Sequence, residues 1–352
     1  MKVILFCQNN YDFGILEPIK NCLKSKGYDY IWFITKKILN DFPFKSDPYT
    51  SLISDLEHYK SDVIFVPGNE VPYYIRGLKT QIFHGLAGEK KGHFRIRHYF
   101  DLYLTQGPYF TNKFNELKSK HKNFDVIETG WPKLDIYGKE KTRYHNFKTD
   151  LLETHSAKKV ILYAPTFSPK LTSAPFLVNE IKTLANNLEY VILLKFHPLM
   201  SEEWLHVYQN LADTIPNILF QNEKNIIKYL LVADLLISDT SSVIYEFILL
   251  DKPIITFNNI SKHIQWEDVN EYNNLAVLVK NNLEKDPFAK SRNKVYQQFH
   301  PYNDGKSAQR MVEIVKTYIN AHGVPKKRKL SFLRKLKIHS IFGKPTKNIT
   351  LV

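Results

Sequence analysis

The chain has 352 residues, of which 43% are hydrophobic and 24% are charged. These are globular values, so the composition excludes a disordered chain and a membrane-embedded one, and the length suffices for two cores of about 150 residues each. No apolar run reaches the ~18 residues of a membrane-spanning helix, and the first residues read as a strand and not as a secretion signal. The two cysteines, Cys7 and Cys22, predict neither a disulfide framework nor a zinc site, which fits a reducing cytosol.

The net charge of +14 is concentrated near the C-terminus. Between Ala321 and Val352 the chain carries nine basic residues and no Asp or Glu, which leaves +5 for everything before. The body of the protein is therefore only mildly basic, and its charge does not by itself predict nucleic-acid binding.

Short β-branched or aromatic runs alternate with longer amphipathic stretches as far as about residue 320. This alternation predicts an α/β fold of repeated βα units around parallel sheets. In the first half the predicted strands are 3–7, 29–34, 63–66, 80–83, 102–105 and 126–128, and clear helices are 15–26 and 109–118. These elements predict one Rossmann-like sheet.

A polar, irregular stretch from residue 130 to 158 is typical of a connection between domains. In the second half the predicted strands are 159–163, 191–195, 218–220, 235–238, 253–256 and 275–279, and the predicted helices are 174–187, 202–212, 226–231, 241–250 and 305–321. We therefore expect two doubly wound domains, 1–145 and 146–322, followed by a basic amphipathic tail, 323–352. Open α/β sheets bind ligands at the carboxyl ends of their strands, so the functional residues should follow strands.

A hydroxyl-rich turn joins a buried strand to an apolar-periodic helix in the second half. The turn is Ser238-Asp239-Thr240-Ser241-Ser242. Backbone N–H groups at a helix start, surrounded by hydroxyls, form an anion site that the helix dipole favours. A phosphate group fits this pattern, but a Ser or Thr that simply caps the helix without any ligand explains it equally well.

Two histidines also follow predicted strands. In Lys195-Phe196-His197-Pro198 the proline ends the strand and leaves a cation and an imidazole where a diphosphate would bind, although a solvent-facing loop explains the same residues. In Phe83-His84-Gly85 a neutral imidazole would accept a proton at cellular pH, and glycine would let a substrate approach the backbone. The alternative for His84 is a structural histidine.

Two further segments end strands. The turn Gly130-Trp131-Pro132-Lys133-Leu134-Asp135 carries one cation and one carboxylate, Lys133 and Asp135, and is as consistent with a hinge as with a site. Thr166, in Tyr163-Ala164-Pro165-Thr166-Phe167, follows the first strand of the second domain at its ligand-binding edge.

These segments, with Asn303-Asp304-Gly305-Lys306-Ser307 and in this order, resemble the CDP-glycerol glycerophosphotransferase family, the teichoic-acid primases and polymerases with a GT-B fold. The resemblance runs from about residue 60 to 320. It implies two Rossmann-like domains facing across a cleft, an N-terminal acceptor domain and a C-terminal nucleotide-donor domain. The sequence departs from the family pattern at Thr240, Phe83, Glu246 and Ser168, where Tyr, Trp, Asp and Arg are usual, which leaves the transferred group open.

The resemblance also implies roles for individual residues. His84 would be the general base on the acceptor hydroxyl, and His197 the second catalytic histidine, on the donor. The remaining donor-binding candidates are Lys195, Thr166, Ser238, Asp239, Thr240, Ser241, Ser242, Asp304 and Gly305, and the acceptor-side candidates are Gly85, Lys133 and Asp135. No cofactor and no bound metal are expected, because no Asp/Glu cluster accompanies these motifs.

The implied reaction transfers glycerol phosphate, or a related polyol phosphate, from a CDP-activated donor to a hydroxyl of a lipid-linked or glycan acceptor. It would release CMP and build a cell-surface polymer. One alternative is a GT-B glycosyltransferase that uses a CMP- or UDP-sugar for capsule or lipopolysaccharide. A second is a non-catalytic nucleotide- or polyanion-binding protein.

The basic tail interleaves cations with apolar residues at helix-compatible positions, Leu330, Leu333, Leu336 and Ile341. Such a segment, from Lys326 to Lys337, can lie on an anionic membrane surface. Because acceptors in this family are lipid-linked, we expect a cytoplasmic protein, peripheral on the inner face of the cell membrane, with no nucleic-acid partner. The alternatives are a disordered basic extension and a nucleic-acid contact.

Overall fold

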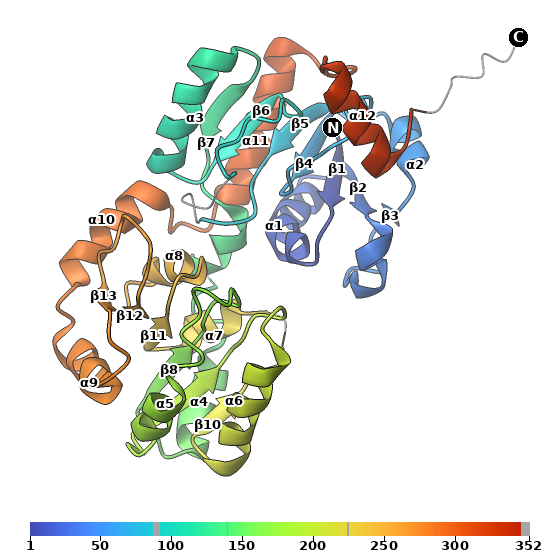
Figure 1. Ribbon diagram of the computed structural model, residues 1–352. Coiled ribbons are helices and arrows are strands. Elements are labelled where there is room, and N and C mark those ends of the chain that lie inside the picture. Colours follow the sequence, from blue (N-terminus) through green and yellow to red (C-terminus); the bar gives the residue numbers. More distant parts are fainter. Residues whose placement is uncertain (87–91, 139, 224, 346–352) are drawn as a thin grey trace, which may run out of the picture. The chain divides into compact units, whose positions relative to one another are not determined.

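The computed structural model describes residues 1–86, 92–138, 140–223 and 225–345, and it divides the chain into two compact units (Figure 1). Unit 1 comprises Met1–Gly138 and Phe299–Val352, and unit 2 comprises Lys139–Gln298. This division differs from the expected linear boundaries, because the chain returns to unit 1 at Phe299. The helix predicted over 305–321 and the basic tail therefore belong to unit 1 and not to a second or third domain.

Unit 1 contains a seven-stranded parallel sheet. Its strands are β1 (Lys2–Cys7), β2 (Asp29–Ile34), β3 (Tyr49–Thr50), β4 (Val63–Val66), β5 (Leu78–Gln81), β6 (Leu102–Thr105) and β7 (Asp125–Glu128). They follow the order β3-β2-β1-β4-β5-β6-β7. The order reverses between β1 and β4, and this topological switch point is where doubly wound sheets bind their ligands.

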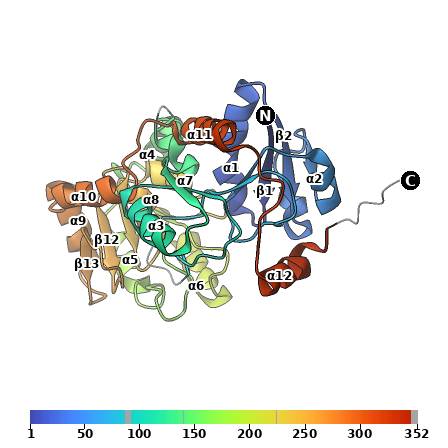
Figure 2. The ribbon, with the colours of Figure 1, turned by 90° about the horizontal axis from the view of Figure 1, so that it is seen from above.

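Helices cover both faces of this sheet. The α-helices are α1 (Tyr11–Ser25), α2 (Ile53–Tyr59), α3 (Pro108–His121), α11 (Ser307–His322) and α12 (Phe332–Phe342), and the 3₁₀ helices are η1 (Lys36–Asp41) and η2 (Pro132–Tyr137). Helices α1 and α11 contact each other on one face, and α12 lies on the opposite face (Figure 2). The core on the α12 face contains Phe6, Leu56, Phe114 and Ile338, from β1, α2, α3 and α12.

Residues 325–342 are an integral part of unit 1. Ile338 is completely buried, and the ring of Phe342 lies 5.5 Å from that of Phe6 in β1. Before the helix, Arg328 donates to the carbonyl of His98 at 2.6 Å and forms an ion pair with Asp101. Of the predicted apolar stripe, Leu330 packs against this core, whereas Leu333, Leu336 and Ile341 are exposed. Ile338, which lies outside the predicted stripe, completes the core of unit 1.

Unit 2 repeats the same topology with six parallel strands. They are β8 (Lys159–Tyr163), β9 (Tyr190–Leu194), β10 (Ile218–Phe220), β11 (Leu235–Ser238), β12 (Ile254–Phe257) and β13 (Glu267–Val269), in the order β10-β9-β8-β11-β12-β13. The helices are α4 (His145–Thr154), α5 (Val178–Leu184), α6 (Glu202–Thr214), α7 (Ile227–Val232), α8 (Val243–Ile248), α9 (Leu275–Lys285) and α10 (Ala289–Phe299), the last of which ends where unit 1 resumes. The switch point lies between β8 and β11. The prediction of two doubly wound parallel sheets is confirmed.

One predicted strand is wrong. Residues 275–279 begin helix α9, whose buried positions Leu275, Val279 and Asn282 repeat at helical spacing. A run of five apolar residues is too short for its period to distinguish a helix from a strand. The sixth strand is instead Glu267–Val269, which has two carboxylates in three residues and sits at the sheet edge, so its sequence gives no strand signal.

Two isoleucines of α12 test whether this helix belongs to the core. Ile338→Ala should lower the free energy of unfolding by ~2–4 kcal/mol, because it leaves a cavity in the core of unit 1. Ile341→Ala removes the same atoms from a side chain that is 46% exposed, and should change stability by less than ~0.5 kcal/mol. Urea denaturation measures both. Equal effects would show that α12 is not docked on unit 1.

Candidate functional site

The predicted residues fall into two sets, one in each unit. Unit 1 contains His84, Gly85, Lys133, Asp135, Asp304 and Gly305, and unit 2 contains Thr166, Lys195, His197 and the turn from Ser238 to Ser242. Asp304 and Gly305, predicted for the nucleotide domain, thus lie in the other unit.

His84 follows β5 at the carboxyl edge of the unit 1 sheet, on a strained turn. Phe83 has a φ of 62°, a left-handed conformation that a bulky residue rarely adopts. Its buried ring stacks on His93 at 5.3 Å, and its carbonyl accepts a hydrogen bond from Trp131 Nε1 at 3.3 Å. The Phe83 side chain thus turns into the core, while His84 is exposed.

The hydrogen bond at Nδ1 sets the tautomer of His84. Nδ1 lies 3.2 Å from the carbonyl oxygen of Pro67, which follows β4 beside the switch point. A carbonyl can only accept, so Nδ1 carries the proton and the neutral ring has its lone pair on Nε2. His84 is therefore set up to accept a proton at Nε2, as a general base must. The ring of Tyr11 lies 5.7 Å away.

Gly85 and Lys133 lie at the same edge of the sheet. The carbonyl of Gly85 accepts a hydrogen bond from Gln106 Nε2 at 3.0 Å, which fixes the start of the loop after His84. The glycine-containing remainder of that loop, 87–91, lies outside the described residues. Lys133 stacks its ammonium group 5.3 Å from the ring centre of Trp131.

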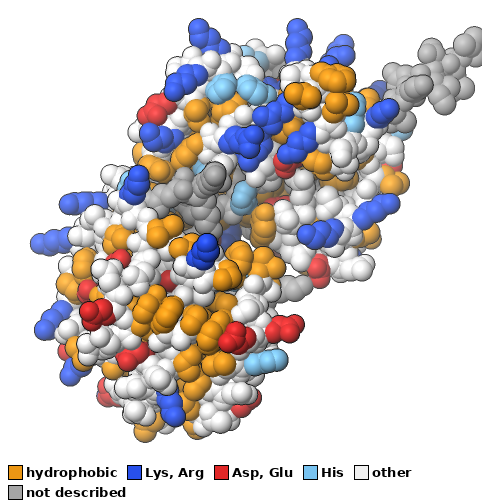
Figure 3. Space-filling view, in the orientation of Figure 1, with side chains coloured by type: hydrophobic (Ala, Val, Ile, Leu, Met, Phe, Trp, Pro, Cys, Tyr) orange, Lys and Arg blue, Asp and Glu red, His pale blue; other side chains and the backbone are white. Residues whose placement is uncertain are grey.

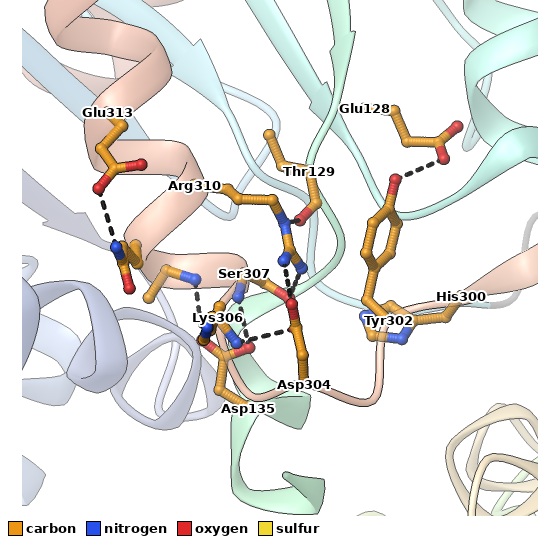
Figure 4. A network of polar contacts seen from close by, with 12 residues as sticks. Glu128, Thr129, Asp135, His300, Tyr302, Asp304, Lys306, Ser307, Arg310 and Glu313 are labelled. Atoms are coloured by element: carbon orange, nitrogen blue, oxygen red, sulfur yellow. Dashed lines mark hydrogen bonds and ion pairs between the residues drawn. The ribbon is translucent and has the colours of Figure 1, made fainter.

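Asp135 and Asp304 are engaged where the returning chain enters α11 (Figure 4). The two oxygens of Asp135 accept hydrogen bonds from the backbone N–H groups of Ser307 and Ala308, each at 2.8 Å. Burial raises the pKa of this carboxyl. Asp304 forms an ion pair with Arg310 at 2.7 Å. Both carboxylates thus organise the first turn of α11, and a role of Asp304 in donor binding stays a prediction.

Gly305 is required by this geometry. Its φ is 68°, and a Cβ at this position would lie 2.8 Å from the carbonyl oxygen of Asp135. The predicted Asp-Gly pair is therefore explained by the turn that precedes α11, whatever further role it has.

Sequence reasoning missed His300, which the structure connects to the turn at His84. Its Nε2 accepts a hydrogen bond from the backbone N–H of Trp131 at 2.8 Å, and the same Trp131 donates its indole N–H to Phe83. Burial lowers the pKa of His300 to about 4. A signal was present, because Phe299-His300-Pro301 repeats the Phe-His-Pro pattern of residues 196–198.

A pH dependence of stability follows from the burial of His300. Its unfolded pKa is ~6.5, so the unfolded chain binds a proton as the pH falls from ~6.5 towards 4 while the folded chain does not, and stability is lost in that window. His300→Gln keeps an acceptor for Trp131 and does not titrate. Between pH 7.5 and 4.5 the wild type should lose ~2–3 kcal/mol more unfolding free energy than the variant. A difference independent of pH would contradict this account.

In unit 2, Ser238 and Asp239 join the two loops at the switch point. Asp239 Oδ1 accepts from the backbone N–H of Thr166 at 2.8 Å, and Oδ2 accepts from the N–H and hydroxyl of Ser173 at 2.8 and 2.9 Å. The Ser238 hydroxyl donates to the carbonyl of Ala164 at 2.7 Å. Burial raises the pKa of Asp239 to about 6. Both side chains are fully buried, so they position the loops, and a role of either residue in donor binding stays a prediction.

Thr240, Ser241 and Ser242 are the partly exposed members of the turn. The Ser241 hydroxyl accepts a hydrogen bond from the N–H of Val243 at 3.4 Å, whereas the Ser242 side chain forms no cap hydrogen bond. Helix α8 spans six residues, fewer than predicted, so its dipole is smaller than expected. An anion site here would depend mainly on backbone N–H groups and hydroxyls.

His197 has the opposite tautomer to His84. Its Nδ1 accepts a hydrogen bond from the backbone N–H of Leu199 at 3.1 Å, so the neutral ring carries its proton on Nε2. The ring stacks on Phe167, with centroids 4.4 Å apart. His197 is thus arranged to donate a hydrogen bond, as stabilisation of a phosphate oxygen requires. Lys195 is buried, which lowers its pKa, and its Nζ donates to the carbonyl of Phe196 at 3.1 Å.

A comparison with family models assigns the chain. Residues 87–317 match the family described as CDP-glycerol:poly(glycerophosphate) glycerophosphotransferase. The chain belongs to this family. The match includes all the unit 2 candidates and the α11 turn, and it begins three residues after His84.

Known relatives agree with this assignment. A teichoic acid glycerol-phosphate primase of Bacillus subtilis is 27% identical over 216 residues, which are 56% of this chain and 53% of the relative. The ribitol-phosphate polymerase TarL of Staphylococcus aureus is 30% identical over 228 residues, 56% of this chain and 39% of the relative. The chain thus spans about half or less of the length of these curated relatives.

Solved structures support the fold. The wall teichoic acid polymerase TagF superposes with a TM-score of 0.66 at 19% identity, covering 92% of this chain and 90% of that one. The S. aureus MnaA–UDP structure superposes equally well, with a TM-score of 0.66 at 14% identity, covering 91% and 97%. The predicted GT-B-like class is confirmed at the level of fold.

Proposed function

We propose that the protein transfers a polyol phosphate from a CDP-activated donor to an acceptor hydroxyl in the synthesis of a cell-surface polymer, with release of CMP. The observation that carries this proposal is the pair of exposed histidines, His84 and His197. Each stands at the carboxyl edge of its sheet, and their backbone hydrogen bonds set opposite tautomers. The membership of the teichoic-acid glycerophosphotransferase family supports the same reaction.

In the proposed mechanism the acceptor oxygen attacks the β-phosphorus of the donor in line with the leaving group. The new P–O bond forms, the bond from this phosphorus to the bridging oxygen of CMP breaks, and the acceptor proton passes to His84 Nε2. His197 Nε2–H and the N–H groups around Ser241 stabilise the charge that develops on CMP. We propose that these groups suffice without a bound metal, with EDTA treatment as the test.

The glycosyltransferase alternative has some structural support. The GT-B-like fold is shared with MnaA, which was solved with UDP, and fold does not determine the donor. Two departures from the family pattern lie at the predicted donor site: Thr240 is in the turn from Ser238 to Ser242, and Ser168 is in the loop after β8. A non-catalytic binding protein remains the second alternative.

A donor screen separates these functions. Nucleotide release from CDP-glycerol, CDP-ribitol, CMP-sugars and UDP-sugars is measured with lipid acceptors that end in a sugar or in glycerol phosphate. We expect CMP release from a CDP-polyol, undiminished by EDTA. His84→Gln should lower kcat by ~10²–10⁴-fold because the general base is lost, with donor affinity unchanged.

The matched control is His58→Gln, an exposed histidine on α2 whose substitution should leave turnover unaltered. Preferred release of UDP would favour the glycosyltransferase, and reversible loss with EDTA would overturn the metal-free mechanism. Nucleotide binding without turnover, unaffected by His84→Gln, would favour a binding protein.

We also propose that the protein works at an anionic membrane surface, through the outer face of α12. Phe332 and Leu333 are 72% and 77% exposed, and Leu336 is 47% exposed. At about 100° per residue these three side chains lie within about 100° of arc, roughly opposite the buried Ile338. No helix in the described part of the chain combines the length and apolar content needed to cross a bilayer, so a helix lying in the interface is the proposed mode.

The charges around this face complement anionic lipid. Figure 3 shows apolar side chains at the place of α12, with Lys and Arg side chains beside them. Lys326, Lys327, Lys329 and Lys344 are exposed. Arg328 and Lys337 are paired with Asp101 and Glu70, so fewer of the nine cations act outward than the sequence suggests.

Vesicle flotation tests this proposal without deleting α12, since deletion would also remove Ile338 from the core. The variant Phe332→Ser/Leu333→Ser/Leu336→Ser should lose binding to phosphatidylserine-containing vesicles. The control Leu188→Ser/Val277→Ser changes exposed apolar residues of unit 2, and should bind like the wild type. Equal flotation of all three proteins would overturn the proposal, and so would wild-type binding to RNA in preference to vesicles.

A further inference from the structure

The turn that presents His84 needs support from outside its own segment. Phe83 holds a left-handed φ of 62°, and such a conformation persists in a bulky residue only when the surrounding structure maintains it. One support is the aromatic cluster around its side chain, with His93 at 5.3 Å and Phe114 at 5.0 Å. A second is the hydrogen bond that its carbonyl accepts from the indole N–H of Trp131.

Trp131 is itself fixed by contacts of its backbone and of the preceding residue. Its side chain is completely buried, and its backbone N–H donates to His300 Nε2 at 2.8 Å. The preceding residue, Gly130, has a φ of 85°, and a Cβ there would lie 2.5 Å from the Ser307 hydroxyl and 3.1 Å from the ring of Tyr302. The segment that returns from unit 2 therefore packs directly against the residue that holds Phe83.

We propose that Trp131 is a positioning residue for His84, and that the returning segment holds it in place through His300. This inference rests on the proposed function of His84 as general base. The carbonyl that Trp131 holds belongs to the peptide bond that leads into His84, so its orientation sets the direction of the imidazole. The Nδ1 contact to Pro67, and with it the lone pair on Nε2, depends on that direction.

The energetic consequence falls on the chemical step. A general base must lie within ~2.6–3.2 Å of the proton it accepts, and a displacement of ~1 Å can cost ~10²-fold in rate. Donor binding involves the unit 2 residues and should be unaffected. Loss of the indole N–H should thus lower kcat while leaving KM for the donor unchanged.

The test compares two tryptophans of unit 1. Trp131→Phe keeps an aromatic ring and removes the N–H. Trp32→Phe does the same to another fully buried tryptophan, whose indole N–H donates at 3.3 Å to Asp47, the distance that Trp131 has to Phe83. We expect Trp131→Phe to lower kcat by ~10–100-fold with KM for the donor within about twofold, and Trp32→Phe to retain wild-type kcat.

A second readout does not need turnover. Nitrogen-15 NMR of the histidine rings, with the His84 signals identified by their loss in His84→Gln, reports the tautomer directly. Trp131→Phe should raise the fraction of His84 that carries its proton on Nε2, and Trp32→Phe should not. If the wild type releases no nucleotide from any donor, the proposed function fails, and this measurement still tests the positioning.

A variant whose side chain has the same shape as tryptophan distinguishes loss of the hydrogen bond from a folding defect. Incorporation of 3-benzothienylalanine at position 131 replaces the indole N–H by sulfur and preserves the bicyclic ring. The proposal predicts the same loss of kcat and the same tautomer change as for Trp131→Phe. Wild-type kcat and an unchanged His84 tautomer in a folded protein would overturn it, as would equal losses in the Trp131 and Trp32 variants.

Discussion

The cap that Asp135 places on α11 is the interaction on which much of unit 1 depends. A carboxylate accepts hydrogen bonds from two N–H groups that the helix cannot pair internally, and it interacts favourably with the positive end of the helix dipole. The cap fixes the start of α11, eight residues after the chain has returned to unit 1 at Phe299. From that point α11 runs against α1, and the chain continues over the sheet edge to α12, whose Ile338 completes the core of the opposite face.

The segment that leads into α11 also supports the proposed general base. His300, Tyr302 and Ser307 pack against Gly130 and Trp131, and Trp131 in turn holds the strained peptide before His84. Trp131 and His300, 169 residues apart in the sequence, thus meet behind the peptide that leads into His84. In unit 2 a buried carboxylate, Asp239, performs the comparable task by joining the loops after β8 and β11. In both units most polar groups near the predicted site residues hold the backbone in place. A few exposed side chains remain available for the proposed substrates.

The two histidines show how hydrogen bonds with the backbone can set which ring nitrogen carries the proton. Both are exposed, and both follow strands that are paired on both sides in doubly wound sheets. A carbonyl acceptor at Nδ1 makes His84 a proton acceptor at Nε2, and an N–H donor at Nδ1 makes His197 a proton donor at Nε2. Identical side chains thereby acquire the two different proton positions that the proposed attack by an alcohol and departure of CMP would require.

The alternation of apolar strands and amphipathic helices was enough to predict the α/β class, the two parallel sheets and most strand positions, because burial on both faces leaves a local pattern. The order of the motifs also identified the family. Only the tertiary structure decided that residues after Phe299 return to unit 1, because which core a helix packs against is a long-range property. It also showed that Ser238 and Asp239 are buried, that His300 supports Trp131, and that one face of α12 belongs to the core. These facts depend on contacts between distant segments, which leave no period or spacing in the local sequence.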